Sequence, residues 1–580
     1  MSRSPSAIVE YLSKVKILFY HASNPFGNTY TWLYPTVLHL KTYVDIMYPD
    51  VANKVHWHVP LQEIVSDEDL IQYLHKHQID ILCTGHYLWN HKDLCEQLAR
   101  VKSKLPSNMK IIAGGPSIDV HTDGNFFNKY SFIDFAVYGP GEQAFADILS
   151  HLILDKPLIA FNTSNCGWIN KKSGKLSLAN YSYVKMLEVS PFVHNQQLFT
   201  DMVTQFKNRA NWLGDNFWLP YTLTRGCPYS CTFCDWNSGL GNKVSRRKYT
   251  FQHDIDLFLK LGATNIYLSD ANVGQYDEDV EMIEYFANKN LQENAKFHVG
   301  GNFSKLKKDN NLKIFHTMIK GSLVKKTINF SVQDINENVL KLIDRPDVGW
   351  DVHSAMAKEL QTAYPDIVIK AQFIFGLPGQ TVESWTDTMQ SAVEKRIYPI
   401  VFFNEPLPNS PALLDPEYQK KFKFEYVETN RCMPGRIYKS LVPKQSFSFT
   451  QSDLVHMLLL SGIFQALAAI QILDQHFEID FQSFRQNLQH DQTYVKYHKD
   501  MLENWQQNNN LYVTNEKISN TNDIYDFIGE VNFVNECLSA PWFGKLVLLH
   551  LPSHQQYDFM KSFLRKKYFD WLRDFFQDVD

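Results

Sequence analysis

Three cysteines that lie within eight residues are the part of this sequence best suited to chemistry. Cys227, Cys231 and Cys234 occupy positions i, i+4 and i+7, so their thiolates can share one small inorganic centre. Gly226 and Pro228 favour a loop around that centre over a regular helix. A cubane of four irons that is held by three cysteines keeps one iron open, where a ligand can be bound and reduced.

A zinc site is the main alternative for these cysteines. Structural zinc normally takes a fourth protein ligand at short spacing, and no nearby Cys or His supplies one here. His194 and His253 are the remote candidates for a fourth ligand. A disulfide with one spare thiol is a weaker alternative for a chain that we expect in a reducing compartment.

The segment TRGCPYSCTFCDW, residues 224–236, resembles the CxxxCxxC loop of the radical S-adenosylmethionine (radical SAM) superfamily, including the aromatic Phe233 before the last cysteine. The resemblance implies a [4Fe-4S] cluster on the three cysteines, with the amino and carboxylate groups of S-adenosylmethionine on the open iron. It also implies reductive cleavage of that cofactor to methionine and a 5′-deoxyadenosyl radical. The implied cofactor contacts at later strand ends are Asp270, Asn272, Ser331, Gln333, Gly376 and Gly379.

Charged residues also follow the cysteine loop. Asp235 and the run Arg246, Arg247 and Lys248 could orient a carboxylate or a substrate anion. A solvated charge run explains the same residues without any such role.

Two series of apolar runs predict the elements that position this loop. Between residues 15 and 154, five runs alternate with amphipathic stretches, which predicts a doubly wound, Rossmann-like parallel sheet in a domain of residues 1–154. Residues 155–216 read as a connector. Six further strand candidates in residues 217–415 predict a partial (βα)6 barrel with its chemistry at the carboxyl ends of the strands. Residues 416–580 read as a mainly helical domain that closes the barrel mouth and selects the substrate.

A doubly wound domain ahead of a radical SAM core resembles the cobalamin-binding subfamily of these enzymes. The resemblance implies that a corrin and its nucleotide tail approach the carboxyl edge of the first sheet. The candidate contacts are Asn28, Thr29, Tyr87, Trp89, Gly114, Gly115, Gly139, Gly141 and Glu142. The pattern DxHxxG at residues 119–124 follows the fourth strand and not the first, so we expect cobalt without a histidine ligand from His121.

Composition and charge narrow the classes of function. Apolar residues make up 44% of the chain and the net charge is −5, which gives no global basic field for nucleic acid. The N-terminus lacks an uninterrupted apolar run, so we expect a cytoplasmic protein. The apolar stretch at 454–473 contains His456, Gln465 and Gln471, which favours a buried helix over a membrane span.

In the subfamily that the chain resembles, the usual outcome is methyl transfer to an unreactive carbon or a phosphorus centre, and this is our first hypothesis. A cobalamin-assisted rearrangement or cyclisation is the second. A third is a methylthiotransferase-like enzyme with a second cluster, which would need Cys83, Cys95 and Cys166 to converge. A non-enzymatic cobalamin or redox sensor is the weakest. The expected partners are a small-molecule or peptide substrate and an external electron donor of flavodoxin or ferredoxin type.

Overall fold

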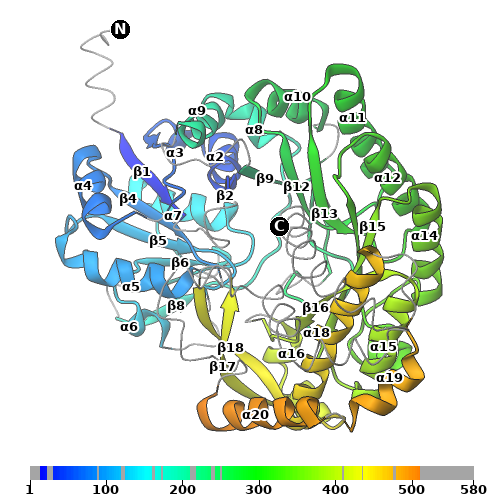
Figure 1. The fold of residues 1–580 in the computed structure, drawn as a ribbon. Coiled ribbons are helices and arrows are strands. Elements are labelled where there is room, and N and C mark those ends of the chain that lie inside the picture. The colour runs from blue at the N-terminus through cyan, green and yellow to red at the C-terminus, as the bar shows by residue number, and fades with distance from the viewer. Residues whose placement is uncertain are drawn as a thin grey trace. The chain divides into compact units, whose positions relative to one another are not determined.

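The computed structural model forms two compact units, Met1–Pro228 with Asp235–Asp270, and Tyr229–Cys234 with Ala271–Asp580 (Figure 1). It describes residues 14–21, 31–63, 65–87, 90–118, 120, 125–159, 163–170, 174–208, 217–236, 242–247, 251–407, 410–433, 436–473, 479–490 and 492–509. Both units combine helices with parallel strands, so the chain has a mixed α/β fold, as the sequence predicts.

The first unit contains the five parallel strands predicted between residues 15 and 154. They are β1 (Val15–Tyr20), β3 (Val55–Trp57), β4 (Ile81–Gly85), β5 (Lys110–Gly114) and β6 (Phe135–Val137). Their order is β3-β1-β4-β5-β6, and all four neighbouring pairs are parallel. The order reverses after β1, so the switch point at which ligands bind in open α/β sheets lies between the carboxyl ends of β1 and β4.

Helices connect these strands because apolar residues recur along one face of each segment. The helices are α2 (Thr36–Met47), α3 (Pro49–Ala52), α4 (Asp67–His77), α5 (His91–Val101), a 3-10 turn (Lys102–Lys104), α6 (Phe126–Lys129) and α7 (Glu142–Leu154). In α4 the Ser66 side chain accepts a hydrogen bond from Asp69 N at 3.0 Å, three acidic residues fill the first turn, and Gln78 ends the helix in a left-handed conformation. These caps fix where α4 begins and ends.

The segment predicted as a connector adds strands to this sheet. β7 (Cys166–Ile169) pairs antiparallel with β6, and β8 (Leu176–Leu178) pairs antiparallel with β7. The sheet is therefore mixed and not purely parallel. The sequence did not predict these strands because β7 spans four residues and β8 three, which is too short for a clear periodic signal.

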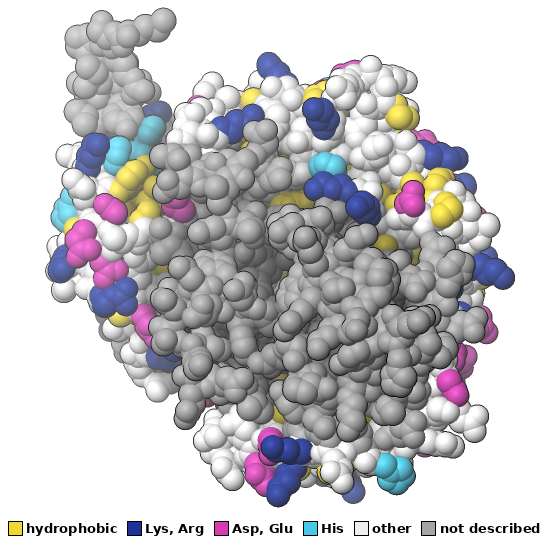
Figure 2. Space-filling view, viewed as in Figure 1, with side chains coloured by type: hydrophobic (Ala, Val, Ile, Leu, Met, Phe, Trp, Pro, Cys, Tyr) yellow, Lys and Arg dark blue, Asp and Glu magenta, His cyan; other side chains and the backbone are white. Residues whose placement is uncertain are grey.

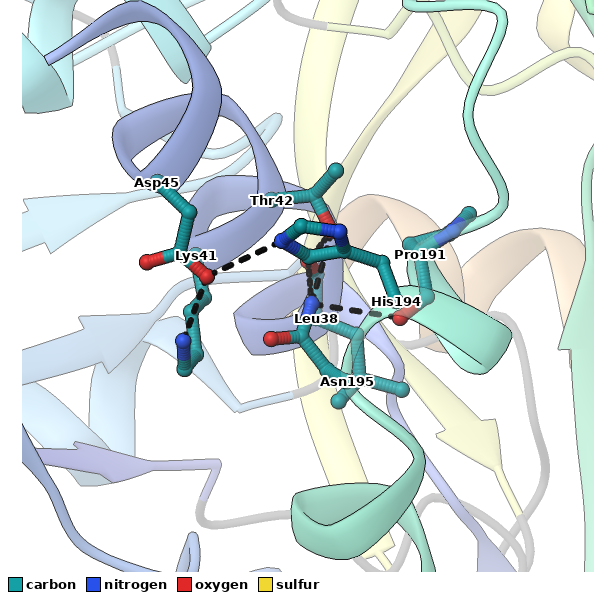
Figure 3. Close-up of polar contacts among 7 residues, drawn as sticks. All are labelled: Leu38, Lys41, Thr42, Asp45, Pro191, His194 and Asn195. Carbon is teal, nitrogen blue, oxygen red and sulfur yellow. Dashed lines mark hydrogen bonds and ion pairs between the residues drawn. The ribbon is translucent and has the colours of Figure 1, made fainter. Parts of the chain in front are cut away.

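The remainder of the same segment forms two helices that dock on α2. They are α8 (Pro191–His194) and α9 (Gln196–Lys207). The Asn195 side-chain amide donates to Thr42 Oγ1 at 2.7 Å and to Leu38 O at 3.2 Å, and His194 Nε2 lies 3.2 Å from an Asp45 oxygen (Figure 3). These contacts fix the α8–α9 turn against the first sheet's helical layer.

A second set of parallel strands begins in the first unit. β9 (Phe217–Tyr221) pairs in parallel with β2 (Thr31–Trp32) and with the start of β12 (Asn265–Val273). Between them lie β10 (Thr224–Arg225), β11 (Ser245–Arg246) and α10 (Phe251–Leu261). The two-residue strand β2 is too short for a periodic signal, and the sequence did not predict it.

The second unit contains the remaining strands of the predicted second series. β14 (Thr327–Gln333), β15 (Val368–Phe375) and β16 (Ile397–Phe403) form a parallel sheet, and β13 (His298–Phe303) precedes them. The intervening helices are α11 (Asp277–Glu293), α12 (Lys308–Lys320), α13 (Glu337–Leu342), α14 (Trp350–Ala363) and α15 (Val382–Glu394). All six predicted strand segments are therefore strands.

The described part of residues 416–580 contains a hairpin besides the expected helices. β17 (Glu425–Met433) pairs antiparallel with β18 (Arg436–Gln445). Its helices are α17 (Pro416–Phe422), α18 (Gln451–Leu473), α19 (Phe481–Leu488) and α20 (Gln492–Asn508), and α16 (Pro411–Leu414) comes just before it. Residues 510–580 of the predicted helical domain lie outside the described residues.

The apolar stretch at 454–473 forms most of α18, a buried helix as predicted. Leu454, Val455, Met457 and Leu459 are fully buried, and Gln465 donates to Pro399 O at 3.1 Å. A search of the described helices finds none whose length and apolarity would suit a membrane crossing. On the face drawn in Figure 2, acidic and basic side chains of the described residues are interspersed.

Candidate functional site

The cysteine loop begins at a glycine that the backbone requires. Gly226 has a φ of +86°, and a Cβ added there would lie 2.1 Å from Lys243 O. β10 and β11 bring the two segments together, with Thr224 opposite Arg246. A side chain at position 226 would therefore clash with backbone, which explains the glycine directly before Cys227.

Ion pairs fix the strands on either side of this glycine. The Arg225 guanidinium donates to both oxygens of the Glu142 carboxylate, in one case at 3.1 Å. The Arg247 side chain is buried, donates to Thr222 O at 3.1 Å and lies 3.7 Å from an Asp254 oxygen. Arg247 is thus a buried structural cation and not part of a solvated charge run, whereas Lys248 lies outside the described residues.

The second part of the loop, residues 229–234, is held by backbone hydrogen bonds of the second unit. Thr232 N donates to Ile343 O at 3.0 Å, and Ala412 N donates to Thr232 O at 2.9 Å. The Tyr229 hydroxyl donates to Gln275 Oε1 at 3.2 Å. The partners Ile343 and Gln275 follow β14 and β12, so this part of the loop lies at carboxyl ends of the parallel strands, where α/β proteins place their chemistry.

None of the three cysteines of the loop is part of a disulfide. Cys227 and Cys231 are buried, and Cys234 is partly exposed. Cys234 N donates to Cys231 O at 3.1 Å, which forms a tight turn between these two thiols. The Phe233 ring packs against Val339, Leu340, Ile343 and Leu377. A role of Phe233 in anchoring the loop follows from this packing.

The end of β14 carries the most unusual backbone near the predicted cofactor contacts. Gln333 has a φ of +76°, which is rare for a residue with a Cβ, and the β14–β15 register shifts between Ser331 and Gln333. Ser331 Oγ donates to Gln372 Oε1 at 3.2 Å. Strain of this kind is retained when the surroundings impose it, and it is concentrated at functional sites.

A buried polar network that the sequence did not predict supports this strand end. Gln380 Nε2 donates to Asp334 Oδ2 at 2.5 Å and to Ile374 O at 2.8 Å. Burial raises the pKa of Asp334 to about 6, and its hydrogen bonds oppose that shift. The Arg345 side chain is also buried and donates to Ser331 O and Val332 O. The segment NFSVQD gave a signal for Asp334, which directly follows the apolar strand β14, whereas Gln380 lies five residues after the end of β15 and had no such signal.

The other predicted contacts of the radical SAM resemblance are described as well. Asp270 is buried and accepts a hydrogen bond from Leu223 N at 2.9 Å, while Asn272 is buried near the end of β12. Gly376 O accepts from Asn404 Nδ2 at 2.9 Å, and Gly379 N donates to Ser448 Oγ at 3.0 Å. Asn272, Gly376 and Gly379 belong to the second unit with Ser331 and Gln333, whereas Asp270 ends the first unit.

The predicted corrin contacts that the structure describes lie at the carboxyl edge of the first sheet or just beyond it. A Cβ on Gly115 would lie 2.4 Å from His86 O, and one on Gly139 would lie 3.1 Å from the Tyr181 ring, so both glycines have an internal packing reason. Gly114 O accepts from His86 N, and Gly141 precedes α7, whose first residue is Glu142. The Tyr87 ring stacks on Tyr34 at 5.6 Å. Asn28, Thr29, Trp89 and His121 lie outside the described residues.

The zinc alternative loses its two named ligands. His194 pairs with Asp45, and His253 is an exposed residue of α10. Among the described residues, one group of His, Cys, Asp and Glu side chains is close enough to hold a single metal ion, and it consists of His86, His91 and Cys95. The second cluster of the methylthiotransferase hypothesis would need Cys83 and Cys166, which do not belong to that group.

Comparison with known proteins defines the class. Residues 221–392 match the radical SAM superfamily, so this part of the chain, which includes the cysteine loop, is a radical SAM domain. Such a domain holds a [4Fe-4S] cluster and S-adenosylmethionine, as the resemblance of the cysteine loop implies.

Two relatives in sequence are named as methyltransferases. The chain is 27% identical over 372 residues to the cobalamin-dependent radical SAM methyltransferase TokK of Streptomyces tokunonensis, which covers 62% of this chain and 50% of TokK. It is 25% identical over 318 residues to the 2-(S-pantetheinyl)-carbapenam-3-carboxylate methyltransferase of Streptantibioticus cattleyicolor, covering 54% of this chain and 45% of that protein. The predicted resemblance to cobalamin-dependent radical SAM methyltransferases is therefore confirmed, and the chain spans about half the length of these relatives.

A solved structure supports the fold. The cobalamin-dependent S-adenosylmethionine radical enzyme OxsB, with aqua-cobalamin and S-adenosylmethionine bound, matches 97% of this chain and 85% of its own with a TM-score of 0.58 and 13% identity. This likeness shows a shared arrangement of the chain.

Proposed function

We propose that this protein is a cobalamin-dependent radical SAM methyltransferase that acts on an unactivated carbon or phosphorus centre. The observation that carries the proposal is the loop of three cysteines outside any disulfide, Cys227, Cys231 and Cys234, inside a radical SAM domain of a chain whose relatives are named as methyltransferases. An odd number of thiolates on one short loop suits a cubane with an open iron better than a closed zinc site.

The residues present fit the cofactors that the family uses. The three thiols would hold the cluster, and the partial exposure of Cys234 gives the loop an accessible side. When bound, the cluster with S-adenosylmethionine supplies one-electron chemistry, and cobalamin supplies a transferable methyl group. The proposed nucleotide and amino acid contacts are Asp270, Asn272, Ser331, Gln333, Gly376 and Gly379.

The chain's own part in this chemistry is to fix positions before reaction. The strained Gln333 and the buried Asp334–Gln380 hydrogen bond hold the end of β14 in one conformation. Preorganised polar groups of this kind bind a cofactor without paying for reorganisation.

The finer fold assignment is part of the same proposal. The Rossmann-like part, predicted as residues 1–154, would bind cobalamin at the switch point between β1 and β4. Residues 217–415 would form the partial (βα)6 barrel, and residues 416–580 would close it and select the substrate. The predicted domain boundaries, the cytoplasmic location and the flavodoxin-like or ferredoxin-like electron donor remain predictions.

The test is methyl transfer from labelled S-adenosylmethionine. The full chain is reconstituted without oxygen with iron, sulfide and cobalamin, reduced, and incubated with a metabolite extract and S-adenosylmethionine that carries a deuterated methyl group. We expect a small-molecule or peptide product with the labelled methyl group, together with 5′-deoxyadenosine.

Matched variants test whether the product depends on the three cysteines of the loop. Replacing Cys227, Cys231 and Cys234 together by alanine should abolish the product and the cluster absorption, whereas Cys83→Ala, at another buried thiol, should abolish neither. Formation of 5′-deoxyadenosine with a rearranged and unlabelled product would replace methyl transfer by the rearrangement hypothesis. A triple variant that keeps the cluster would contradict the proposal altogether.

A further inference from the structure

Two histidines and a cysteine of the first unit converge outside the predicted site. His86 directly follows β4, and His91 and Cys95 lie one turn apart on α5, so that both face the same side of the helix. Their ligand atoms all lie within 4.8 Å of one another. This grouping draws on neither the cysteine loop nor any predicted cofactor contact.

The distances resemble the edges of a metal coordination sphere. His86 Nδ1 lies 3.1 Å from His91 Nδ1, and Cys95 Sγ lies 3.9 Å from the first and 4.0 Å from the second. In a tetrahedral zinc site, bond lengths of about 2.05 Å to nitrogen and about 2.3 Å to sulfur give edges of about 3.3 Å and about 3.6 Å. Shifts of a few tenths of an ångström therefore suffice to bring all three atoms to one ion.

The other ring nitrogen of each histidine is already engaged. His86 Nε2 lies 2.9 Å from Thr84 Oγ1, and His91 Nε2 lies 3.2 Å from the Tyr130 hydroxyl. Histidines that bind metals through one nitrogen usually form a hydrogen bond through the other, which fixes the tautomer and the ring orientation. The His86 ring thus turns its Nδ1 atom toward Cys95, whereas the His91 ring has both nitrogens at similar distances from Cys95 Sγ, 4.0 Å for Nδ1 and 3.9 Å for Nε2. Metal binding would therefore need a small rotation of the His91 ring as well.

Burial favours the neutral form of each of these groups. His86 and Cys95 are buried, and His91 is partly buried. Burial lowers the pKa of His91 to about 4 and raises the pKa of the Cys95 thiol to about 12, so the thiol would lose its proton only when a cation replaces it. The nearby charges are the exposed residues Lys129 and Glu96, whose effects on the thiol are opposite in sign.

We propose that His86 Nδ1, His91 Nδ1 and Cys95 Sγ bind one Zn²⁺ ion, with a fourth position for water. Binding replaces the thiol proton by the metal, so one proton is released and no electron is transferred. The ion would tie α5 to the β4–α5 connection, where His86 N donates to Gly114 O at 2.7 Å and Ser117 N donates to His86 O at 3.2 Å. The proposal is independent of the proposed methyltransferase function.

A metal-free explanation exists and makes different predictions. One imidazole Nδ1–H can donate to the other Nδ1 across the same 3.1 Å, with the thiol as a neighbour only. In that case the chain takes up no stoichiometric zinc, and the two Nδ1 atoms share one proton.

The experiment is zinc X-ray absorption on the full chain, purified under reducing conditions, supplied with Zn²⁺ and freed of excess metal. This measurement is specific for zinc, so bound iron and cobalt do not interfere. We expect one zinc per chain, with two nitrogen neighbours at about 2.0–2.1 Å and one sulfur neighbour at about 2.3 Å. Zinc that enters the cysteine loop would instead show three sulfur neighbours, and repeating the measurement in the Cys227, Cys231 and Cys234 triple alanine variant removes that contribution.

Single variants assign the ligands. His91→Ala or Cys95→Ala in the triple-variant background should lower bound zinc at least tenfold, and Cys83→Ala should leave it unchanged because Cys83 lies outside the group. The wild-type spectrum decides even if a variant does not fold. Absence of stoichiometric zinc, or zinc without a sulfur neighbour in the triple variant, would overturn the proposal.

Discussion

Gly226→Ala tests the argument that local backbone geometry holds the cysteine loop. A residue with a Cβ at the φ of +86° costs about 1–2 kcal/mol. The added Cβ would also lie 2.1 Å from Lys243 O, a backbone atom that cannot rotate away, and overpacking of this kind costs about 1–3 kcal/mol. The total is a destabilisation of about 2–5 kcal/mol, unless the loop shifts to relieve the clash.

A shift of the loop would be as informative as a loss of stability. Cys227 follows position 226 directly, so relief of the clash displaces the first of the three proposed cluster ligands. We therefore expect Gly226→Ala to lower the free energy of unfolding in urea, to lower the iron and sulfide content per chain, or to lower both.

Gly174→Ala is the matched control. Gly174 has a φ of +64°, and an added Cβ there meets nothing within 4 Å, so this substitution carries the conformational cost alone. It should destabilise the chain by about 1–2 kcal/mol and leave the iron content unchanged. If Gly226→Ala matches Gly174→Ala in both stability and iron content, the reasoning about the loop is refuted.

Three further predictions concern the second unit. Burial raises the pKa of Asp334 from 3.8 to about 6, so its protonated form adds to the free energy of unfolding; this contribution is complete below about pH 4 and is lost as the pH rises through 6. Asp334→Asn should remove this decrease in the free energy of unfolding, about 3 kcal/mol between these pH values in urea titrations. Gln333→Gly removes the strain of a positive φ and should leave the free energy of unfolding within about 1 kcal/mol of the wild-type value. The Kd for S-adenosylmethionine, measured by calorimetry, should rise about tenfold. An unchanged Kd would show that Gln333 does not contact the cofactor. The Trp385 indole is fully buried and donates hydrogen bonds to Met457 O and Ser461 Oγ. Trp385→Phe removes these bonds and should lower the free energy of unfolding in urea by about 1–3 kcal/mol. An unchanged free energy of unfolding would contradict the packing of α15 on α18.

The strands that are buried along most of their length could be predicted, because their sequences are continuous apolar runs. The strands β1, β4, β5 and β15 are buried along most of their length, so their apolar runs stand out from the amphipathic helices. The cysteine loop was equally clear, since its spacing matters more than its surroundings. The matched superfamily domain begins within β9, close to where the sequence places the second series.

Structure with a weak local signal was missed. β2 spans two residues, β8 three and β7 four, and such short strands show no clear alternation of their own. The β17–β18 hairpin has a usable signal in the Pro434–Gly435 pair between two alternating segments, which the sequence analysis did not use.

In the candidate site too, residues marked by a local sequence pattern could be predicted, and residues joined by contacts far apart in the sequence could not. The positions near the carboxyl ends of β12 and β14 and just after β15 could be named from the predicted strand ends alone, and whether they touch a cofactor remains a prediction. Gln380 as the partner of Asp334 and Arg345 as a donor to strand β14 depend on contacts across many residues, which periodicity does not record. The pairing of His91 with Cys95 at helical spacing was readable, but His86 joins them only through the fold.

The distant anchors of the cysteine loop have a consequence during synthesis. Thr232 reaches its partner Tyr418 across 186 residues, and the backbone partner Ala412 is nearly as far along the chain. At about 5–20 residues per second, a ribosome needs about 10–40 s to make the intervening polypeptide. During that interval Cys231 and Cys234 emerge without the neighbours that later position them. Iron and sulfide delivery is therefore expected after translation has passed these anchors, and premature oxidation of the nascent thiols is the hazard that the timing creates.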